Sequence, residues 1–191
     1  MIENQTLFGT GLLPRGVFFT RGKGVAREKL ASFEMALRGA GIARYNIVKV
    51  SSIYPPGCRI ITRREGTRRL RPGQIVFVVM SENQTNEPFR QLSASIGLAA
   101  PADRTQYGYL SEHHSFGQTA RASDDYAEDL AATMLASTLG IEFDPDRAYD
   151  ERKEIYRMSG RIVTSRSITQ SARGDPNGRW TTVLGAAVFI L

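Results

Sequence analysis

Several features are scarce in this sequence of 191 residues, and each scarcity excludes a class of protein. The single cysteine, Cys58, excludes a disulfide within the chain and favours a reducing, cytoplasmic location. No apolar run approaches the ~20 residues that cross a bilayer, so we expect no membrane span. The first residues lack a basic stretch followed by an apolar one, so we also expect no signal peptide.

Histidine is also scarce. The only two histidines are the neighbours His113 and His114, which follow Glu112. Adjacent side chains on a strand point to opposite faces, so the two imidazoles cannot easily bind one ion. We therefore expect no metal site, although a histidine beside an acidic residue can tune the pKa of that acid.

Positive charge is in excess, with a formal net charge of +6. The densest cluster is formed by the arginines of residues 63–71, and no aromatic side chains are interleaved there to stack on bases. This stretch is interpreted either as a solvated turn between two strands or as an anion-binding patch. We expect no nucleic-acid partner.

Apolar residues recur at helical spacing in two stretches. The first runs from Ala26 to Ala40 and is predicted to end at Gly39 or Gly41, because glycine adopts the left-handed cap easily. The second is predicted to begin at Ser123, as its cap, and to end at Gly140.

The other apolar stretches predict strands, at residues 6–20, 46–50, 58–63, 75–80, 96–100, 107–111, 149–170 and 180–191. Residues 21–24 are predicted to form a loop, and the segment 144–179 is expected to add a strand pair or an arm. Helices and strands do not alternate regularly, which argues against a doubly wound fold. The sequence predicts a single-domain α+β sandwich of mainly antiparallel sheet over residues 1–191.

The most informative stretch is the serine pair Ser51-Ser52, between a predicted strand and the rigid turn at Pro55-Pro56. Ser52 Oγ can attack the Ser51 carbonyl and shift the acyl group from nitrogen to oxygen. Elimination and hydrolysis would then leave a pyruvoyl group at position 52. The prolines limit how far Ser52 can relax. Serine pairs also precede ordinary turns, because serine hydroxyls bind nearby backbone.

Four ordered motifs resemble the pyruvoyl-dependent arginine decarboxylases. They are Val50-Ser-Ser-Ile53 with Pro55-Pro56, the helical stretch Phe33–Ile42, the segment Ile96–Pro101 and the segment Gly108–Glu112. The resemblance covers roughly residues 7–140 and the last strand. It implies an αββα sandwich and self-cleavage of a zymogen into residues 1–51 and 52–191. It also implies a homotrimer or higher multiple with active sites between subunits, in which Glu112 and the pyruvoyl group from Ser52 are expected to come from neighbouring chains.

The resemblance further implies conversion of L-arginine to agmatine and CO2, through a Schiff base to the pyruvoyl group in place of pyridoxal phosphate. Glu112 matches the proton donor, and a carboxylic acid donates at neutral pH only where burial favours its neutral form. Tyr109 and Leu110 are expected to provide apolar cover for it.

Two more residues match family positions. Asn46 matches an asparagine near the scissile bond, so its amide either polarises the Ser51 carbonyl or is an ordinary residue at a strand start. Glu34 stands where the family usually has aspartate. Either it binds the guanidinium of the substrate with a changed reach, or it is a solvated residue on a helix face.

Two other hypotheses remain open. Because Glu34 differs from the usual aspartate, the same chemistry could serve another amino acid. Alternatively, the chain is an unprocessed, non-catalytic oligomer that binds anions or nucleic acid through Arg63–Arg71. Polyamine synthesis and acid resistance both fit an arginine decarboxylase as physiological roles.

Overall fold

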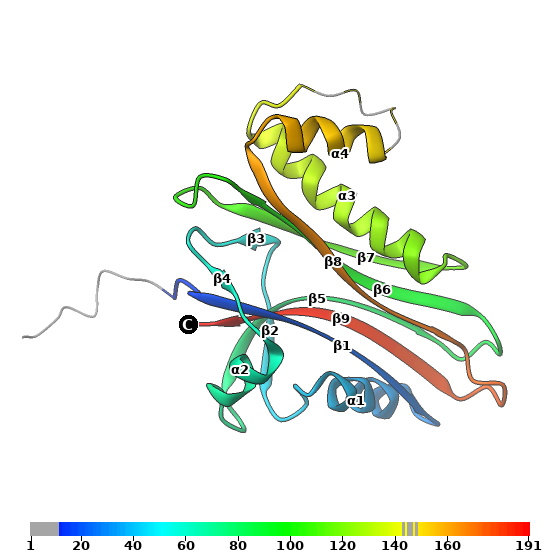
Figure 1. The fold of residues 1–191 in the computed structure, drawn as a ribbon. Helices are drawn as coiled ribbons and strands as arrows, with labels where there is room; N and C mark the ends of the chain where they lie inside the picture. The colour runs from blue at the N-terminus through cyan, green and yellow to red at the C-terminus, as the bar shows by residue number, and fades with distance from the viewer. Residues whose placement is uncertain (1–11, 143, 145–146, 148) are drawn as a thin grey trace, which may run out of the picture.

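The computed structural model describes residues 12–142, 144, 147 and 149–191. Within these residues, two sheets pack face to face and helices cover both outer faces (Figure 1). The helices are α1 (Lys29–Ala40), α2 (Arg63–Arg68), α3 (Ala120–Thr138) and α4 (Tyr149–Met158). The first two lie outside one sheet and the last two outside the other, so the expected layered α+β sandwich is confirmed.

The first sheet has five strands in the order β2-β5-β9-β1-β4. Its strands are β1 (Gly16–Ala26), β2 (Asn46–Lys49), β4 (Arg59–Ile60), β5 (Ile75–Thr85) and β9 (Trp180–Ile190). The three long strands pair antiparallel, and the short edge strands β2 and β4 each add a parallel pair. The predicted buried strand at the C-terminal end is confirmed as β9, which lies at the centre of this sheet.

The second sheet has four antiparallel strands in the order β3-β7-β6-β8. Its strands are β3 (Ile53–Tyr54), β6 (Gln91–Pro101), β7 (Gly108–Phe116) and β8 (Ile162–Arg173). Because β3 has only two residues, most of β7 has one neighbouring strand in the sheet, β6. The apolar core between the two sheets includes Val79, Ile96, Leu98, Leu110 and Ala187.

The predicted loop at residues 21–24 is wrong, because β1 runs through it to Ala26. Its glycines serve close packing. A Cβ at Gly22 would collide with the Ala36 carbonyl, and one at Gly24 with the backbone of Ser32. These glycines let α1 lie directly on the sheet. The first part of the strand predicted over residues 6–20 lies outside the described residues. Within the described residues, β1 begins at Gly16.

Both predicted helices are confirmed, with one change at an end. Gly41 ends α1 in the left-handed region, with a φ of 76°. The cap of α3 is Thr119, whose Oγ1 accepts a hydrogen bond from the Ala122 N–H at 3.1 Å. Ser123, predicted as the cap, instead lies buried and bonds to serine hydroxyls of β6, so that prediction was wrong.

The other two helices replace predicted strands or turns. The basic stretch after Thr62 is α2, because the Thr62 hydroxyl caps it and Gly66 lets it pack closely on Phe18. The strand predicted over 149–170 is divided into α4 and β8. Ion pairs from Arg152 and Lys153 hold α4 against α3. Because β8 pairs along nearly its whole length with β6, the segment 144–179 is part of the sandwich and not an added arm.

No helix among the described residues is long and apolar enough to cross a membrane.

Candidate active site

The serine pair lies where the chain crosses from one sheet to the other. The Val50 N–H donates to the Val78 carbonyl at 2.9 Å, so Val50 still follows β5 of the first sheet. The Ser52 carbonyl accepts from the Leu110 N–H at 2.8 Å, so Ser52 already follows β7 of the second sheet. The Ser51–Ser52 peptide bond therefore spans the two layers.

A tight turn forms around this bond. The Ile53 N–H donates to the Ser51 carbonyl oxygen at 2.9 Å, which makes a three-residue turn centred on Ser52. This carbonyl is the one that Ser52 Oγ would attack. A donor at a carbonyl oxygen stabilises the negative charge that develops there during attack. The backbone alone thus provides one hydrogen bond of an oxyanion site.

A buried hydrogen bond holds the segment that follows this turn. The Tyr54 hydroxyl donates to the Cys58 carbonyl at 2.5 Å, and both residues are buried in the core between the sheets. Burial, and then the neighbouring Cys58, raise the pKa of Tyr54 to about 12, against a lowering by Arg104. Burial raises the pKa of the Cys58 thiol to about 11. Both groups are therefore neutral at neutral pH, and the core around them holds no charge of theirs.

The structure brings Glu112 close to Ser52. Ile53 pairs with Tyr109 across the β3–β7 ladder, so Ser52 lies opposite Leu110. Glu112 is two positions further along β7 and on the same face as Leu110. Such diagonal neighbours lie roughly 7–8 Å apart. A carboxyl group therefore stands within side-chain reach of the proposed pyruvoyl position.

The apolar cover expected for Glu112 is incomplete within one chain. Leu110 is fully buried on the same face, but Tyr109 points to the other face, where its hydroxyl bonds to Thr138 Oγ1 at 3.0 Å. Glu112 itself is exposed. If Glu112 is to donate a proton, the burial that this requires would have to come from outside this chain.

Two polar residues of β5 hold the backbone of β7 beside Glu112. Ser81 Oγ donates to the His113 carbonyl at 2.7 Å, and Asn83 Nδ2 donates to the Ser115 carbonyl at 2.9 Å. Both side chains are buried. They continue an inward-facing row that begins with Phe77 and Val79 in the core between the sheets. The change from apolar to polar in this row is a sequence signal that the sequence analysis missed.

The two histidines lie on opposite faces of β7, as predicted from the alternation of a strand. The His113 ring bonds to Gln118 Oε1 at 2.9 Å and packs on Tyr126, with ring centroids 4.4 Å apart. His114 is exposed. Among the described residues, no group of three or more His, Cys, Asp or Glu side chains is arranged to hold a metal ion.

Asn46 is placed at the other end of β2. Its Nδ2 donates to the Gly73 carbonyl at 2.7 Å, and its backbone N–H donates to the Gln74 carbonyl. Five residues of extended chain, at about 3.3 Å each, separate it from Ser51 by about 16 Å. One chain therefore does not bring Asn46 to the scissile bond.

Glu34 lies on α1, outside the five-stranded sheet. Its Oε1 accepts from Arg38 Nε at 2.6 Å, in a partly exposed pair on one helix face. Glu112 lies on β7 of the four-stranded sheet, whereas Glu34 lies on the outer side of the five-stranded sheet. The two carboxylates therefore do not meet within one chain. Ser52 and Glu112 form one group, and Glu34 and Asn46 lie apart from it.

An apolar cavity of about 370 Å³ adjoins the scissile bond. Leu12, Ser51, Ile53 and Phe77 are among its lining residues. Leu12 and Ile53, which both line this cavity, are 71% and 40% exposed, and grouped exposed apolar side chains are typical of interaction sites.

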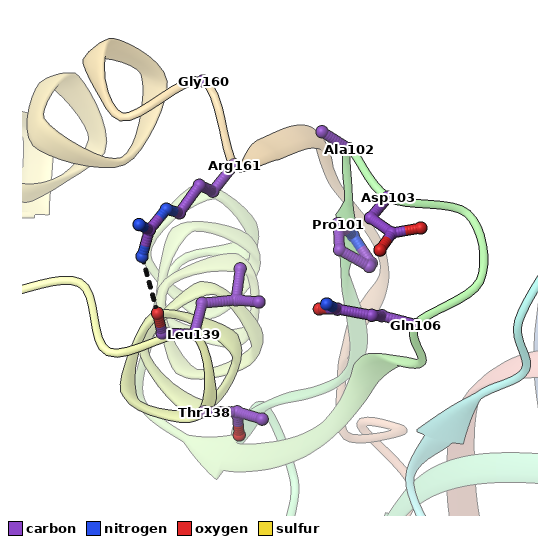
Figure 2. A pocket seen from close by; sticks show the side chains of 8 residues that line it. All are labelled: Pro101, Ala102, Asp103, Gln106, Thr138, Leu139, Gly160 and Arg161. Atoms are coloured by element: carbon purple, nitrogen blue, oxygen red, sulfur yellow. Dashed lines mark hydrogen bonds between the residues drawn. The ribbon is translucent and has the colours of Figure 1, made fainter.

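A second cavity, of about 350 Å³, lies between the end of α3 and the loop after β6 (Figure 2). Arg161 Nη1 donates to the Leu139 carbonyl at its rim, at 2.8 Å, and the Gln106 side chain points into it. It contains none of the expected site residues.

A half-buried hydroxyl next to a hydrogen-bonded carbonyl, with a carboxyl group nearby, fits the precursor of a pyruvoyl group. The site is therefore a candidate active site of a self-processing enzyme, which makes its own electrophilic group from its chain.

Comparison with known proteins agrees with this class. Residues 16–191 match the family described as pyruvoyl-dependent arginine decarboxylase (PvlArgDC). A probable pyruvoyl-dependent arginine decarboxylase of Chloroherpeton thalassium is 60% identical over 178 residues, which cover 93% of this chain and 98% of that protein. The chain belongs to the pyruvoyl-dependent arginine decarboxylase family.

Two further relatives are less similar in sequence. The pyruvoyl-dependent arginine decarboxylase of Methanococcoides burtonii is 55% identical over 180 residues, covering 94% of this chain and 100% of that protein. That of Nitrosopumilus maritimus is 53% identical over 180 residues, covering 94% and 98%. The family match includes residues 141–179, which the resemblance of the sequence motifs had left out.

Proposed function

We propose that this protein converts L-arginine to agmatine and CO2 with a pyruvoyl group made by cleavage between Ser51 and Ser52. The hydrogen bond from the Ile53 N–H to the Ser51 carbonyl, at the crossover between the sheets, is the observation that carries the proposal. The family membership and the names of relatives that are 53–60% identical support the same activity. The pyruvoyl group supplies a carbonyl electron sink for the electrons left as CO2 departs.

Cleavage starts when Ser52 Oγ attacks the Ser51 carbonyl carbon. The peptide C–N bond breaks, an ester forms, and the nitrogen of Ser52 takes up a proton. Loss of the Cα hydrogen of Ser52 then expels the Ser51 carboxylate and leaves a dehydroalanine. One water hydrolyses it, ammonia departs, and residue 52 becomes the blocked first residue of the larger fragment.

The sandwich supports cleavage without separation of the fragments. The segment 1–51 contributes β1, α1 and β2, whereas 52–191 contributes the other strands. β1 lies between β9 and β4 and pairs with β9 over eleven residue pairs. The two fragments therefore share both the sheet and the core, and we propose that they remain one domain.

We assign Glu112 as the proton donor to the carbon that loses CO2. Its place beside Ser52 supports this role, and its exposure in one chain calls for a second subunit that covers it. We infer a homotrimer, or a higher multiple, in which a neighbouring subunit brings Glu34 and Asn46 toward Ser52. The exposed apolar side chains around Ser51 support an interface there.

Glu34 would bind the guanidinium of the substrate. Its present partner, Arg38, is four residues along the same helix and exposed. Such pairs are worth only about 0.3–0.5 kcal/mol, so a substrate guanidinium can replace Arg38 at little cost. Glutamate reaches further than the aspartate that the family usually has at this position. This difference in reach can change which of arginine, lysine and ornithine the site prefers. We place the enzyme in the cytoplasm, which suits the buried, unpaired Cys58.

Intact mass spectrometry of the purified protein tests the proposal. We expect two fragments, residues 1–51 and 52–191, with a pyruvoyl mass on the larger one. Agmatine and CO2 should form from arginine, and lysine or ornithine should compete weakly. A preparation that stays one intact chain and releases no CO2 contradicts the proposal.

A further inference from the structure

A third cavity, of about 450 Å³, lies at one end of the sandwich. One wall comes from the segment between β3 and β4, and the other from the end of β6 and the loop that follows it. It therefore bridges the two sheets. Its volume is in the range of about 300–1,000 Å³ that small-molecule sites occupy. None of Ser51, Ser52, Glu112, Asn46 and Glu34 lines it.

Two arginines from separate segments line this cavity. Arg59 comes from β4 and Arg104 from the loop after β6, and no aspartate or glutamate is among the lining residues. Among the residues that the structure describes, neither guanidinium has a hydrogen bond or an ion pair. Arg38 and Arg69, by contrast, are each paired with a glutamate of their own helix.

Arg104 acts electrostatically on Tyr54, which also lines the cavity. Burial is the main cause that raises the pKa of Tyr54 to about 12, and the neighbouring Cys58 adds to it, but Arg104 acts in the opposite direction. The Tyr54 hydroxyl is nearly inaccessible and already bonded to the Cys58 carbonyl. A guanidinium that acts on a buried group at this depth also attracts an anion placed between them.

The acidic residue next in sequence does not neutralise Arg104. Asp103 Oδ1 accepts hydrogen bonds from the Thr105 N–H and hydroxyl, at 2.9 and 2.7 Å. The carboxylate is thus held in its own loop, on the side of the cavity in Figure 2. Gln106, which lines both cavities, adds a neutral donor.

The remaining walls are apolar and include Ile60, Pro101 and the Tyr54 ring. We propose that this cavity binds a small organic dianion, a dicarboxylate or a phosphate monoester, with its charged oxygens on Arg59 and Arg104 and its carbon skeleton against the apolar walls. Planar guanidinium groups match carboxylate and phosphate oxygens in pairs. The proposal does not depend on the proposed decarboxylase activity.

Isothermal titration calorimetry of the full-length protein tests this site, with succinate and glycerol 3-phosphate as separate probes. We expect saturable millimolar or tighter binding of at least one probe, and the better probe identifies the type of anion. The double variant Arg59→Gln/Arg104→Gln should weaken binding at least about tenfold, because two charge-assisted contacts are lost. The variant Arg104→Lys keeps the charge but loses the planar, two-pronged guanidinium. Its dissociation constant should lie between those of the unchanged protein and the double variant.

The matched control is Arg90→Gln/Arg121→Gln, which removes the same charge from exposed residues that line none of the three cavities. Its dissociation constant should stay within about twofold of that of the unchanged protein, because distant surface charges are screened. Equal weakening by both double variants would overturn the proposal, since the attraction would then be diffuse. Absence of saturable binding of both probes up to about 20 mM would overturn it as well. Unchanged thermal midpoints establish that the variants are folded.

Discussion

Two regions of the chain carry the expected catalytic residues, and they differ in how much of a site each one completes. At the crossover, backbone hydrogen bonds place Ser52 and Glu112 as neighbours between the sheets. On the α1–β2 side, Glu34 and Asn46 bond to groups of their own surroundings, away from the scissile bond. In the proposed oligomer, the crossover is one half of the site, and the α1–β2 side of a neighbouring chain would provide the other half.

The largest effect is expected at the crossover itself. Ser52→Ala removes the attacking hydroxyl, so the chain should remain uncleaved and show no decarboxylation. Ser51→Ala is the matched control, because the Ser51 carbonyl belongs to the backbone and cleavage should continue. A denaturing gel and intact mass report both results. Cleavage of the Ser52→Ala chain at this bond would place the nucleophile elsewhere.

Glu112→Gln should leave cleavage intact and lower the turnover number by about 10²–10⁴-fold, the usual contribution of a general acid. Glu87→Gln, at an exposed turn between β5 and β6, is the control and should retain normal turnover. Measurement of CO2 release separates the two variants. Normal turnover with Glu112→Gln would remove this residue from the half-site.

Mixed oligomers test whether the two regions act across chains. Glu34→Ala and Glu112→Gln, each nearly inactive alone, should regain activity when co-expressed, so that whole chains fold and assemble before they are cut. About a quarter of the interfaces in a random 1:1 mixture then combine two unchanged halves. A mixture of Ser52→Ala with Glu112→Gln should regain none, since both changes lie in the same half. Equal recovery in the two mixtures would show that the halves are not separate.

A smaller effect is expected at the buried polar residues of β5 that bond to the backbone of β7. Ser81→Ala loses the hydrogen bond to the His113 carbonyl and should lower the free energy of unfolding by about 0.5–1.5 kcal/mol. Urea unfolding measures the loss, and faster hydrogen exchange at residues 112–115 would locate it. Ser137→Ala, on the exposed side of α3, should change neither measurement.

The smallest effect concerns alkaline pH. Folding keeps the Cys58 thiol protonated up to a pKa of about 11, whereas its ordinary pKa is 9.0. The folded state therefore binds more protons in this interval, and its stability is complete below about pH 9 and falls as pH rises toward 11. Above about pH 10, Tyr54 adds a slope of its own, because its pKa is raised from 10.0 to about 12. Unfolding curves from pH 8 to 10 should therefore show the slope of Cys58, and Cys58→Ala should flatten it. An unchanged slope in the variant would mean that other groups cause it.

The local features of the fold followed from the sequence where one stretch determines them. Gly41 ends α1, and the turn at Pro55-Pro56 follows the serine pair, because backbone sterics act within a few residues. Gly22 and Gly24 were taken for a loop, since only the packing of α1 on β1 explains them. The charged stretch of α4 likewise became helical through ion pairs with α3, which no local pattern reveals.

The candidate site shows the same division. The serine pair and Glu112 could be selected from motifs, but their proximity depends on the register between β3 and β7. Ser81 and Asn83 were missed because a polar residue in a strand is informative only when its buried face is known. The distance between Asn46 and Ser51 follows from the length of an extended strand, but it could be given only once the pairing of β2 with β5 was known.

The position of β1 between β9 and β4 has a practical consequence. A sheet whose inner strand comes from a separate short chain is the arrangement used in fragment complementation, where two polypeptides made apart assemble by strand insertion. Co-expressed residues 1–51 and 52–191 should therefore form a folded natural split protein. Its second chain would begin with an ordinary serine amine, so assembly and cofactor formation could be studied one without the other.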